Sequence, residues 1–386
     1  LCDRIKNIYL LATEKIPDEV EGCEMLMIDS PASTATFRTI ALHADTAYTL
    51  LYTKYTAFEP GQFAFERLLA IAGDTNAGML YADRYLLKNG NSQQAPVIDY
   101  QKGSLRDDFD FGSLLFFRSS VLKQAVRAMD ADYRFAGLYD LRLRVSELAE
   151  LVHVNEYLYS EVETDIRKSG EKLFDYVDPK NRAVQIEMEA VCTAYLKRVG
   201  GYLAPDFEPV TFDAGGFEQE ASVIIPVHNR IRTIEDAIRS VLAQKTTFRF
   251  SLIIVDNHST DGTSEAIEKY TADGRVVHLV PERSDLGIGG CWNVGVHHPA
   301  CGKFAVQLDS DDVYSGPDTL QKIVDAFYEQ NCAMVVGTYR MTDFKMNEIP
   351  PGIIDHREWT LENGRNNALR INGLGAPRAF YTPVLR

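Results

Sequence analysis

Residues 304–312 read Phe-Ala-Val-Gln-Leu-Asp-Ser-Asp-Asp, and this stretch decides the fold of the second half of the chain. An apolar run of strand length ends in Asp309, Asp311 and Asp312. A buried strand that ends in acids delivers them to the edge of an open α/β sheet, where such sheets bind ligands. Carboxylates this close repel one another unless a cation lies between them, and Mg²⁺ and Mn²⁺ take oxygen ligands. The stretch favours a metal–diphosphate site; the alternative is an acidic turn that starts a helix.

Length and composition limit the classes of function. A chain of 386 residues predicts two or three domains, and its 45% apolar and 25% charged content is ordinary for globular protein. The net charge of −15 argues against a nucleic-acid partner. Six scattered cysteines without a C-x-x-C pair fit reduced thiols. Since no apolar run reaches the roughly 18 residues of a transmembrane helix, we expect a cytoplasmic protein, with peripheral association with the inner face of a membrane left open.

Apolar strands and amphipathic helices alternate through the second half. This order predicts a mostly parallel sheet covered on both faces. The strands Leu252–Asp256 and Phe304–Asp309 both end in an acid, so Asp256 and Asp309 should lie along one crevice. Asp256 could accept a hydrogen bond from a base or a ribose, and the loop 287–290 could let the backbone approach a phosphate. The other predicted strands are 222–226, 276–280 and 333–337. The predicted helices lie in 232–244, 263–270 and 320–327, and a further helix opens at 286–290.

Residues 221–386 resemble an inverting family 2 glycosyltransferase of the GT-A fold. The resemblance is carried by Ser-Val-Ile-Ile-Pro-Val-His-Asn at 222–229, Val-Asp-Asn-His-Ser-Thr-Asp-Gly-Thr at 255–263, Asn293, and Leu-Asp-Ser-Asp-Asp at 308–312. It implies that Asp256 faces the base, usually uracil, that Asp309 contacts the ribose or the metal, and that Asp311 is the main ligand of Mn²⁺ or Mg²⁺. It also implies a nucleotide pocket lined by Pro226, Val227, Asn229, Gly287 and Asn293. Where the family has a second acid after Asp256, this chain has Asn257.

The resemblance implies metal-dependent transfer of a sugar with inversion. The donor would be a nucleotide-diphosphate sugar, with a UDP-sugar favoured and a hexosyl or N-acetylhexosaminyl group moved. The acceptor would be a hydroxyl of a glycan or of a lipid-linked glycan, in polysaccharide or glycoconjugate biosynthesis. Trp359 and Arg378 are expected on the acceptor side, although Trp359 could serve core packing and Arg378 a surface ion pair.

Two alternative functions stay open. A nucleotidylyltransferase shares an α/β nucleotide site and a metal, but it would need a Gly-rich basic signature that residues 225–230 lack. A pseudo-transferase scaffold would bind glycan or nucleotide without transfer. The acids Asp309 and Asp311 argue against the scaffold for the second domain and leave it open for the first.

Residues 1–165 resemble a degenerate second copy of the GT-A fold. Residues 25–30 parallel the strand that ends in Asp256, and residues 48–53 take the place of the metal-binding strand. Thr53-Lys54-Tyr55 stands in place of the D-x-D motif, and the ammonium group of Lys54 cannot ligate Mg²⁺. We therefore expect two α/β domains with mostly parallel sheets, the first being structural or acceptor-binding. Residues 166–219 would be a linker with one helix at 182–199, and 220–386 the transferase domain.

The catalytic base of the family is an acid that opens a helix after the acceptor-side segment. That segment is 372–378 here, and no such acid follows before Arg386. We expect the base beyond Arg386. The matching motif occurs in the first domain, where Asp140 is the second candidate.

Overall fold

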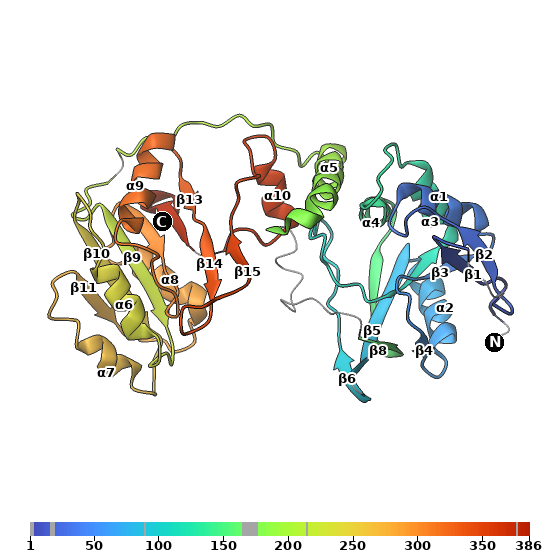
Figure 1. Ribbon diagram of the computed structural model, residues 1–386, viewed down its shortest axis with the longest axis horizontal. Helices are drawn as coiled ribbons and strands as arrows, with labels where there is room; N and C mark the ends of the chain where they lie inside the picture. The colour runs from blue at the N-terminus through green and yellow to red at the C-terminus, as the bar shows by residue number, and fades with distance from the viewer. Residues whose placement is uncertain (1–3, 16–19, 89, 164–176, 214, 376) are drawn as a thin grey trace. The chain divides into compact units, whose positions relative to one another are not determined.

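The computed structural model describes residues 4–15, 20–88, 90–163, 177–213, 215–375 and 377–386 (Figure 1). The chain forms two compact units, one of residues 1–204 and 358–372, the other of residues 205–357 and 373–386. Helix α5 (Arg182–Arg198), which we expected within a linker, belongs to the first unit. Residues 166–176 of that expected linker lie outside the described residues.

The second unit contains a six-stranded sheet in the order β11-β10-β9-β12-β16-β13. The first four strands in this order pair in parallel, as predicted. Strand β16 lies between β12 and β13 and is antiparallel to both. The strands are β9 (Ala221–Val227), β10 (Phe250–Asp256), β11 (Val276–Leu279), β12 (Phe304–Gln307), β13 (Met334–Val336) and β16 (Arg378–Tyr381).

Helices cover both faces of this sheet because its central strands are apolar on both faces. Successive side chains of a strand point to opposite faces. Ile225 therefore packs with helices α6, α7 and α9, and Ile224 packs with α8. This arrangement leaves the carboxyl ends of β9, β10 and β12 to carry polar groups. The helices are α6 (Ile234–Leu242), α7 (Thr263–Glu268), α8 (Gly287–His297) and α9 (Thr319–Gln330).

Three strands near the end of the chain were not predicted. Strands β14 (Tyr339–Thr342) and β15 (Glu348–Ile354) form an antiparallel hairpin, and β16 enters the main sheet. The pair Pro350–Pro351 argued against a strand, because proline lacks the N–H of a ladder hydrogen bond and is confined to sheet edges. A two-stranded hairpin consists of edges alone, so it accepts both prolines.

The first unit contains a mixed sheet in the order β3-β7-β5-β8-β4, with β6 paired to β5. Only the β5–β8 pair is parallel within this sheet, which departs from the mostly parallel sheet we expected. Strands β1 and β2 form a separate parallel pair. The strands are β1 (Tyr9–Ala12), β2 (Glu24–Met27), β3 (Tyr48–Tyr52), β4 (Phe58–Pro60), β5 (Met79–Lys88), β6 (Asn91–Ala95), β7 (Leu114–Arg118) and β8 (Leu151–Val162).

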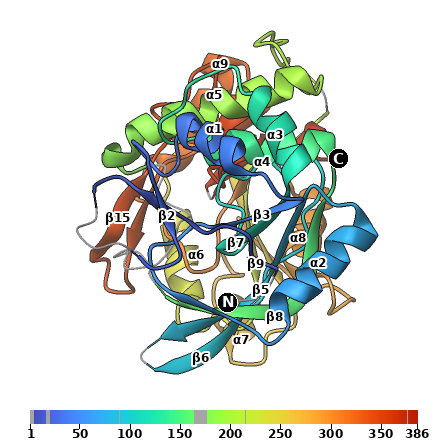
Figure 2. The ribbon, with the colours of Figure 1, turned by 90° about the vertical axis from the view of Figure 1, so that its right-hand side faces the viewer.

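Helices also cover both faces of the first unit's sheet. One core joins α1, α3 and α4 to β5 and β7, and a second core joins α2 to the opposite face (Figure 2). Tyr81 and Leu80, neighbours on β5, enter these two cores respectively. The helices are α1 (Thr34–His43), α2 (Ala64–Thr75), α3 (Ser119–Arg127) and α4 (Gly137–Leu148).

The two units share one arrangement of strands. In the second unit β12, α9 and β13 follow in the chain, and β16 then enters between the two strands. In the first unit β3, the short strand β4, α2 and β5 follow in the chain, and β7 enters between β3 and β5 in the same antiparallel sense. Lys54 follows β3 as Asp309 follows β12, and its Nζ lies 2.8 Å from Oε1 of the buried Glu161. An internal ammonium–carboxylate pair thus occupies the strand end that carries acids in the second unit.

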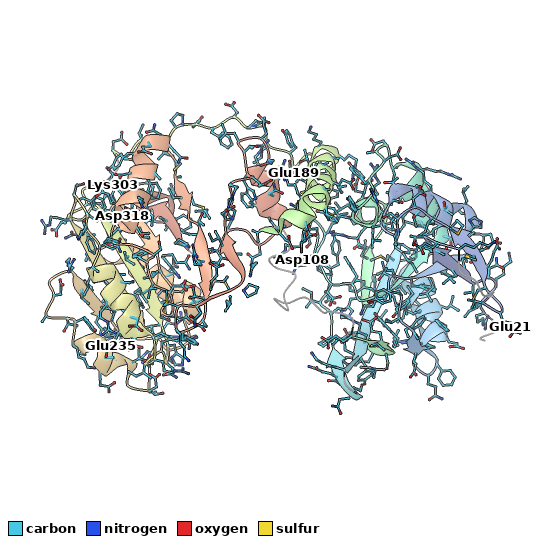
Figure 3. The ribbon with its side chains drawn as sticks, in the orientation of Figure 1. Glu21, Asp108, Glu189, Glu235, Lys303 and Asp318 are labelled. Atoms are coloured by element: carbon cyan, nitrogen blue, oxygen red, sulfur yellow. The ribbon has the colours of Figure 1, made fainter. Side chains whose placement is uncertain are left out.

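Helix α10 (Gly364–Arg370) packs on α5 within the first unit. Glu189 of α5 (Figure 3) accepts hydrogen bonds at Oε2 from Asn363 Nδ2, at 3.1 Å, and from Asn367 Nδ2, at 3.3 Å. The guanidinium of Arg370 is buried and pairs with Asp107. Asp107 thus helps to anchor α10 in the first unit.

Candidate functional site

The loops after β9 and β10 are joined by hydrogen bonds at the carboxyl edge of the sheet. Asn229 N donates to Ser259 Oγ at 2.9 Å, and Asn229 Oδ1 accepts from Thr260 N at 2.8 Å. Arg230 N donates to Thr263 Oγ1 at 2.8 Å. Asn229 holds a φ of 53°, a conformation that asparagine tolerates better than most residues. Thus Asn229, predicted to line a nucleotide pocket, fixes the shape of this edge.

Asp256 is fully buried at the end of β10. Its Oδ1 accepts from Ser259 N at 2.9 Å, and its Oδ2 accepts from Ser264 Oγ. His278 Nε2 lies 3.6 Å from Oδ2. Burial alone would raise the pKa of Asp256, but the interactions with His278, Ser259 and Ser264 outweigh it and hold the pKa well below its usual range. Asp256 is fully buried and both its oxygens accept hydrogen bonds from its own loop, so the geometry gives no support to the predicted contact with a base.

Asn257, the next residue, carries an unused acceptor. Its side-chain Oδ1 is buried and has no hydrogen-bond partner among the described residues. Its backbone N–H donates to Val227 O at 2.8 Å, and its carbonyl is 2.8 Å from His228 Nδ1. A buried polar atom without a partner costs stability, so such an atom marks a place where a ligand or water can bind. Our sequence analysis noted Asn257 only as a departure from the family; that departure was the signal for this position.

The acidic segment begins where β12 ends. The strand stops at Gln307, two residues earlier than predicted, and Asp312 N donates to Asp309 O at 3.1 Å in a turn. Asp311 is half exposed, with its Oδ2 3.8 Å from Arg230 Nε. Asp312 lies at the surface but is partly enclosed by the surrounding protein. This partial burial, and in second place the charges of Asp309 and Asp311, raise the pKa of its carboxyl to about 6.

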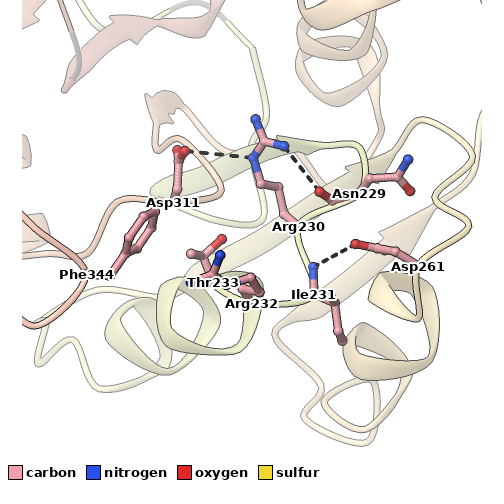
Figure 4. Close-up of a pocket in the computed structure, with 8 residues that line it drawn as sticks. All are labelled: Asn229, Arg230, Ile231, Arg232, Thr233, Asp261, Asp311 and Phe344. Atoms are coloured by element: carbon pink, nitrogen blue, oxygen red, sulfur yellow. Dashed lines mark hydrogen bonds and ion pairs between the residues drawn. The ribbon is translucent and has the colours of Figure 1, made fainter.

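An open cavity of about 330 Å³ lies beside this segment (Figure 4). Arg230 and Asp311 both line it, so it offers a cation and an anion close to one another. Phe344, from the turn between β14 and β15, adds an aromatic wall, and the Arg232 guanidinium lies 5.4 Å from its ring centre. The other lining residues are Asn229, Ile231, Thr233 and Asp261.

The acidic segment fits a hard divalent cation. No group of three or more metal-ligating side chains is preassembled in the part of the chain that the structure describes. Mg²⁺ and Mn²⁺ do not need such a cage, since one or two carboxylates and the phosphates of a substrate complete their coordination. After burial, the charges of Asp309 and Asp311 contribute to the raised pKa of Asp312, and a bound cation would reduce this repulsion. Asp309 and Asp311 therefore remain suitable ligands.

Residues 222–381 match the family model described as glycosyl transferase family 2. This part of the chain belongs to glycosyltransferase family 2. The family 2 domain includes the cavity, both loops and the acidic segment described above. It also includes residues 358–372, which pack in the first unit.

Curated relatives of the family 2 domain are bacterial glycosyltransferases. The putative teichuronic acid biosynthesis glycosyltransferase TuaG of Bacillus subtilis is 33% identical over 120 residues, which cover 31% of this chain and 46% of that protein. The putative glycosyltransferase EpsE of the same organism is 31% identical over 120 residues, which cover 31% of this chain and 42% of that protein. The matches thus span less than half the length of these relatives.

Among solved structures, S. aureus TarS is similar to part of the chain. The likeness covers 43% of this chain and 48% of the TarS fragment, at 26% identity and a TM-score of 0.35. TarS has also been solved in complex with UDP-GlcNAc.

The remaining predicted nucleotide residues of the family 2 domain differ in exposure. Pro226 and Val227 are buried in β9, so they can form only the floor of a pocket. Gly287 opens α8 with a φ of 58°, and a Cβ added there would meet no atom within 4 Å. Asn293 is exposed on α8. A ligand can therefore reach Gly287 and Asn293 on α8, whereas the side chains of Pro226 and Val227 on β9 are buried.

Two further predicted residues belong to the first unit. Asp140 lies in the first turn of α4, is 1% exposed, and accepts at Oδ1 from Arg144 Nε at 2.9 Å. Burial raises the pKa of Asp140, while Arg144 lowers it in part. A buried carboxylate in an ion pair cannot reach an acceptor hydroxyl, which argues against Asp140 as a base. Trp359 belongs to the first unit, beside Gly364 of α10.

Within the described residues, no helix combines the length and apolar character needed to cross a bilayer.

Proposed function

We propose that the family 2 domain transfers a sugar from a nucleoside-diphosphate sugar, with a UDP-sugar favoured, to a hydroxyl of a glycan or lipid-linked acceptor. The proposal is supported above all by one observation: Asp311 and Arg230 line one cavity at the sheet edge where the loops after β9 and β10 are joined. Carboxylates for a metal and a cation for phosphate are what a nucleotide-sugar site needs.

Asn257 is our candidate for contact with the base. Uracil presents an N–H donor between two carbonyl acceptors. The unused Oδ1 of Asn257 can accept from that N–H, and the amide Nδ2 can donate to a neighbouring carbonyl. Asp256 supports this contact indirectly, because its hydrogen bonds with Ser259 and Ser264 fix the loop that follows Asn257. The edge of adenine would place its N6 donor and N1 acceptor in different positions.

Asp309 and Asp311 would hold Mn²⁺ or Mg²⁺ together with the donor's diphosphate. When bound, the metal supplies positive charge that neutralises the nucleoside diphosphate as it leaves. Arg230 lies close enough to Asp311 to contribute to the same charge balance. The backbone of Gly287, unobstructed at the start of α8, is placed to approach a phosphate.

The proposed reaction is a single displacement. The acceptor oxygen forms a bond to the anomeric carbon while the bond from that carbon to the diphosphate oxygen breaks, which inverts the anomeric configuration. The hydroxyl proton passes to a carboxylate base. We do not assign this role to Asp140, because its carboxylate is buried against Arg144.

We propose that the first unit is a non-catalytic copy of the same fold. The shared strand arrangement supports the relationship, and Lys54 in place of an acid argues against a metal there. The Lys54–Glu161 pair neutralises the strand end internally, which removes the need for an external cation.

A product assay tests the proposal. The whole chain is incubated with Mn²⁺ and a panel of nucleoside-diphosphate sugars, and the released nucleoside diphosphate is measured. We expect release from UDP-sugars that needs Mn²⁺ and is lost in Asp311→Asn. Once an acceptor has been identified, NMR of the product should show the anomeric configuration opposite to that of the donor. Release of inorganic pyrophosphate from a nucleoside triphosphate and a sugar phosphate would instead indicate a nucleotidylyltransferase.

A further inference from the structure

We propose that Arg378 is a positioning residue for Asp309, acting through Gln307, and not an acceptor-side contact. The inference rests on the proposed function, because it concerns how the same donor site is held in shape. It assigns a role to Arg378 on β16 and to Gln307 on β12.

The three side chains form a continuous chain of hydrogen bonds. Arg378 Nε donates to Gln307 Oε1 at 2.7 Å, and Gln307 Nε2 donates to Asp309 Oδ1 at 3.3 Å. Val306 of β12 pairs with Ala379 of β16, so the next residues, Gln307 and Arg378, come side by side. The antiparallel strand β16 thus brings a guanidinium beside the end of the parallel strand β12.

A glutamine at the buried position 307 would destabilise the fold unless its amide formed hydrogen bonds. Gln307 is 4% exposed and ends an otherwise apolar strand. Here both ends of the amide have partners: its oxygen accepts from Arg378, and its nitrogen donates to Asp309. A buried amide with a partner at each end is held in a single orientation.

Arg378 decides which way this amide points. A guanidinium has donors and no acceptor, so only the Gln307 oxygen can face it. The amide nitrogen must then face Asp309, where it donates to the carboxylate. With Oδ1 held in this way, Asp309 Oδ2 remains available for a ligand. Without Arg378 the amide could rotate and present its oxygen to the carboxylate, which would repel it.

The test measures binding of UDP in the presence of Mn²⁺ by calorimetric titration of the whole chain. Arg378→Met and Gln307→Met should each weaken this binding by roughly tenfold, the scale of one hydrogen bond to a charged group. The double variant should bind about as weakly as each single variant, because both break the same chain of bonds. Arg239→Met, an exposed arginine on α6, is the matched control for loss of positive charge and should bind as the natural chain does.

Two conservative variants separate positioning from folding. Arg378→Lys keeps a donor toward Gln307 and should restore part of the affinity. Gln307→Glu still accepts from Arg378 but has no donor for Asp309, so it should bind as weakly as Gln307→Met. If both variants melt like the natural chain and follow this order, the inference stands. Affinities that follow thermal stability instead would overturn it.

Other outcomes separate this inference from the proposed function. If the natural chain binds UDP with Mn²⁺ but the Arg378 and Gln307 variants bind equally well, only the positioning role is wrong. Unchanged donor binding with a raised KM for an acceptor in Arg378→Met would return Arg378 to the acceptor side. If the natural chain binds no nucleoside diphosphate, both proposals fail together.

Discussion

Arg230 Nε lies 3.8 Å from Asp311 Oδ2, so the carboxylate that we propose as a metal ligand faces a cation of its own chain. Both side chains are about half exposed, which makes the pair weak and exchangeable. A divalent metal and the guanidinium would compete for Asp311, whereas a bound diphosphate would attract both.

Arg230→Met should therefore change metal and nucleotide binding in opposite directions. Mn²⁺ alone should bind a few-fold more tightly, because an exposed ion pair is worth up to about 1 kcal/mol. UDP with Mn²⁺ should bind more weakly, since a positive charge beside the phosphates is lost. Electron paramagnetic resonance of free Mn²⁺ and calorimetry of UDP measure the two effects. A decrease in both affinities would show that Arg230 does not compete with the metal.

Asp311→Asn should abolish the Mn²⁺-dependent rise in melting temperature that UDP produces. Ligands that bind only the folded state raise the melting temperature, and this ligand would lose its metal. The melting temperature without ligand should stay close to that of the natural chain, because the side chain is half exposed. Asp325→Asn, an exposed acid on α9, is the control. Retention of the Mn²⁺ effect in Asp311→Asn would remove Asp311 from the site.

Asn257→Ala should weaken UDP binding by roughly 1–3 kcal/mol, the scale of a buried hydrogen bond lost. Binding of ADP, which cannot use the same donor and acceptor pattern, should change less. Asp256→Ala should instead lower the free energy of unfolding, because Ser259 and Ser264 lose their acceptor. An equal loss of UDP and ADP affinity in Asn257→Ala would indicate a contact other than the base.

The Asp256–His278 pair predicts how stability depends on pH. The pKa of Asp256 is lowered on folding, so its contribution is present above the unfolded value of about 4 and is lost as pH falls through the folded value. Asp256, followed by Glu268, raises the pKa of His278 on folding. The contribution of His278 is therefore present below about 6.5 and is lost as pH rises through the folded value.

Between about pH 4 and 6.5 both contributions are present, so the pair stabilises the fold most in this window. Above about pH 6.5, the free energy of unfolding measured in urea should decline less in His278→Gln than in the natural chain. An identical decline in both proteins would assign the pH dependence to other groups.

The whole chain should bind one equivalent of the Mn²⁺–UDP complex. The first unit carries Lys54 at the strand end where the second unit carries acids, and Lys54 is already paired with Glu161. Calorimetry of the chain gives this stoichiometry directly. Two equivalents, or one that survives in Asp311→Asn, would place a nucleotide site in the first unit.

The sequence predicted the second unit's parallel strands because each is a continuous apolar run followed by turn residues. It placed Asp309 and Asp311 at the end of such a strand, and the structure leaves them accessible there. It did not predict β16, whose pairing depends on contacts distant in the chain, nor therefore the link from Arg378 to Gln307.

Asp256 and Asn257 show a different limit. Both residues follow the same strand, and sequence alone ranked the charged one higher as a ligand contact. The carboxylate of Asp256 accepts hydrogen bonds from its own loop, whereas the amide oxygen of Asn257 has no hydrogen-bond partner among the described residues. No pattern of residue types distinguishes an acid that supports a loop from one that binds a ligand.

The central claim is that Asp309 and Asp311 form a metal-dependent site for a nucleoside diphosphate. The most direct measurement is calorimetric titration of the whole chain with UDP, first with Mn²⁺ and then with EDTA. We predict binding with Mn²⁺ that EDTA removes and that neither Asp309→Asn nor Asp311→Asn retains. UDP binding of equal strength with and without metal, or no binding in either condition, would contradict the account.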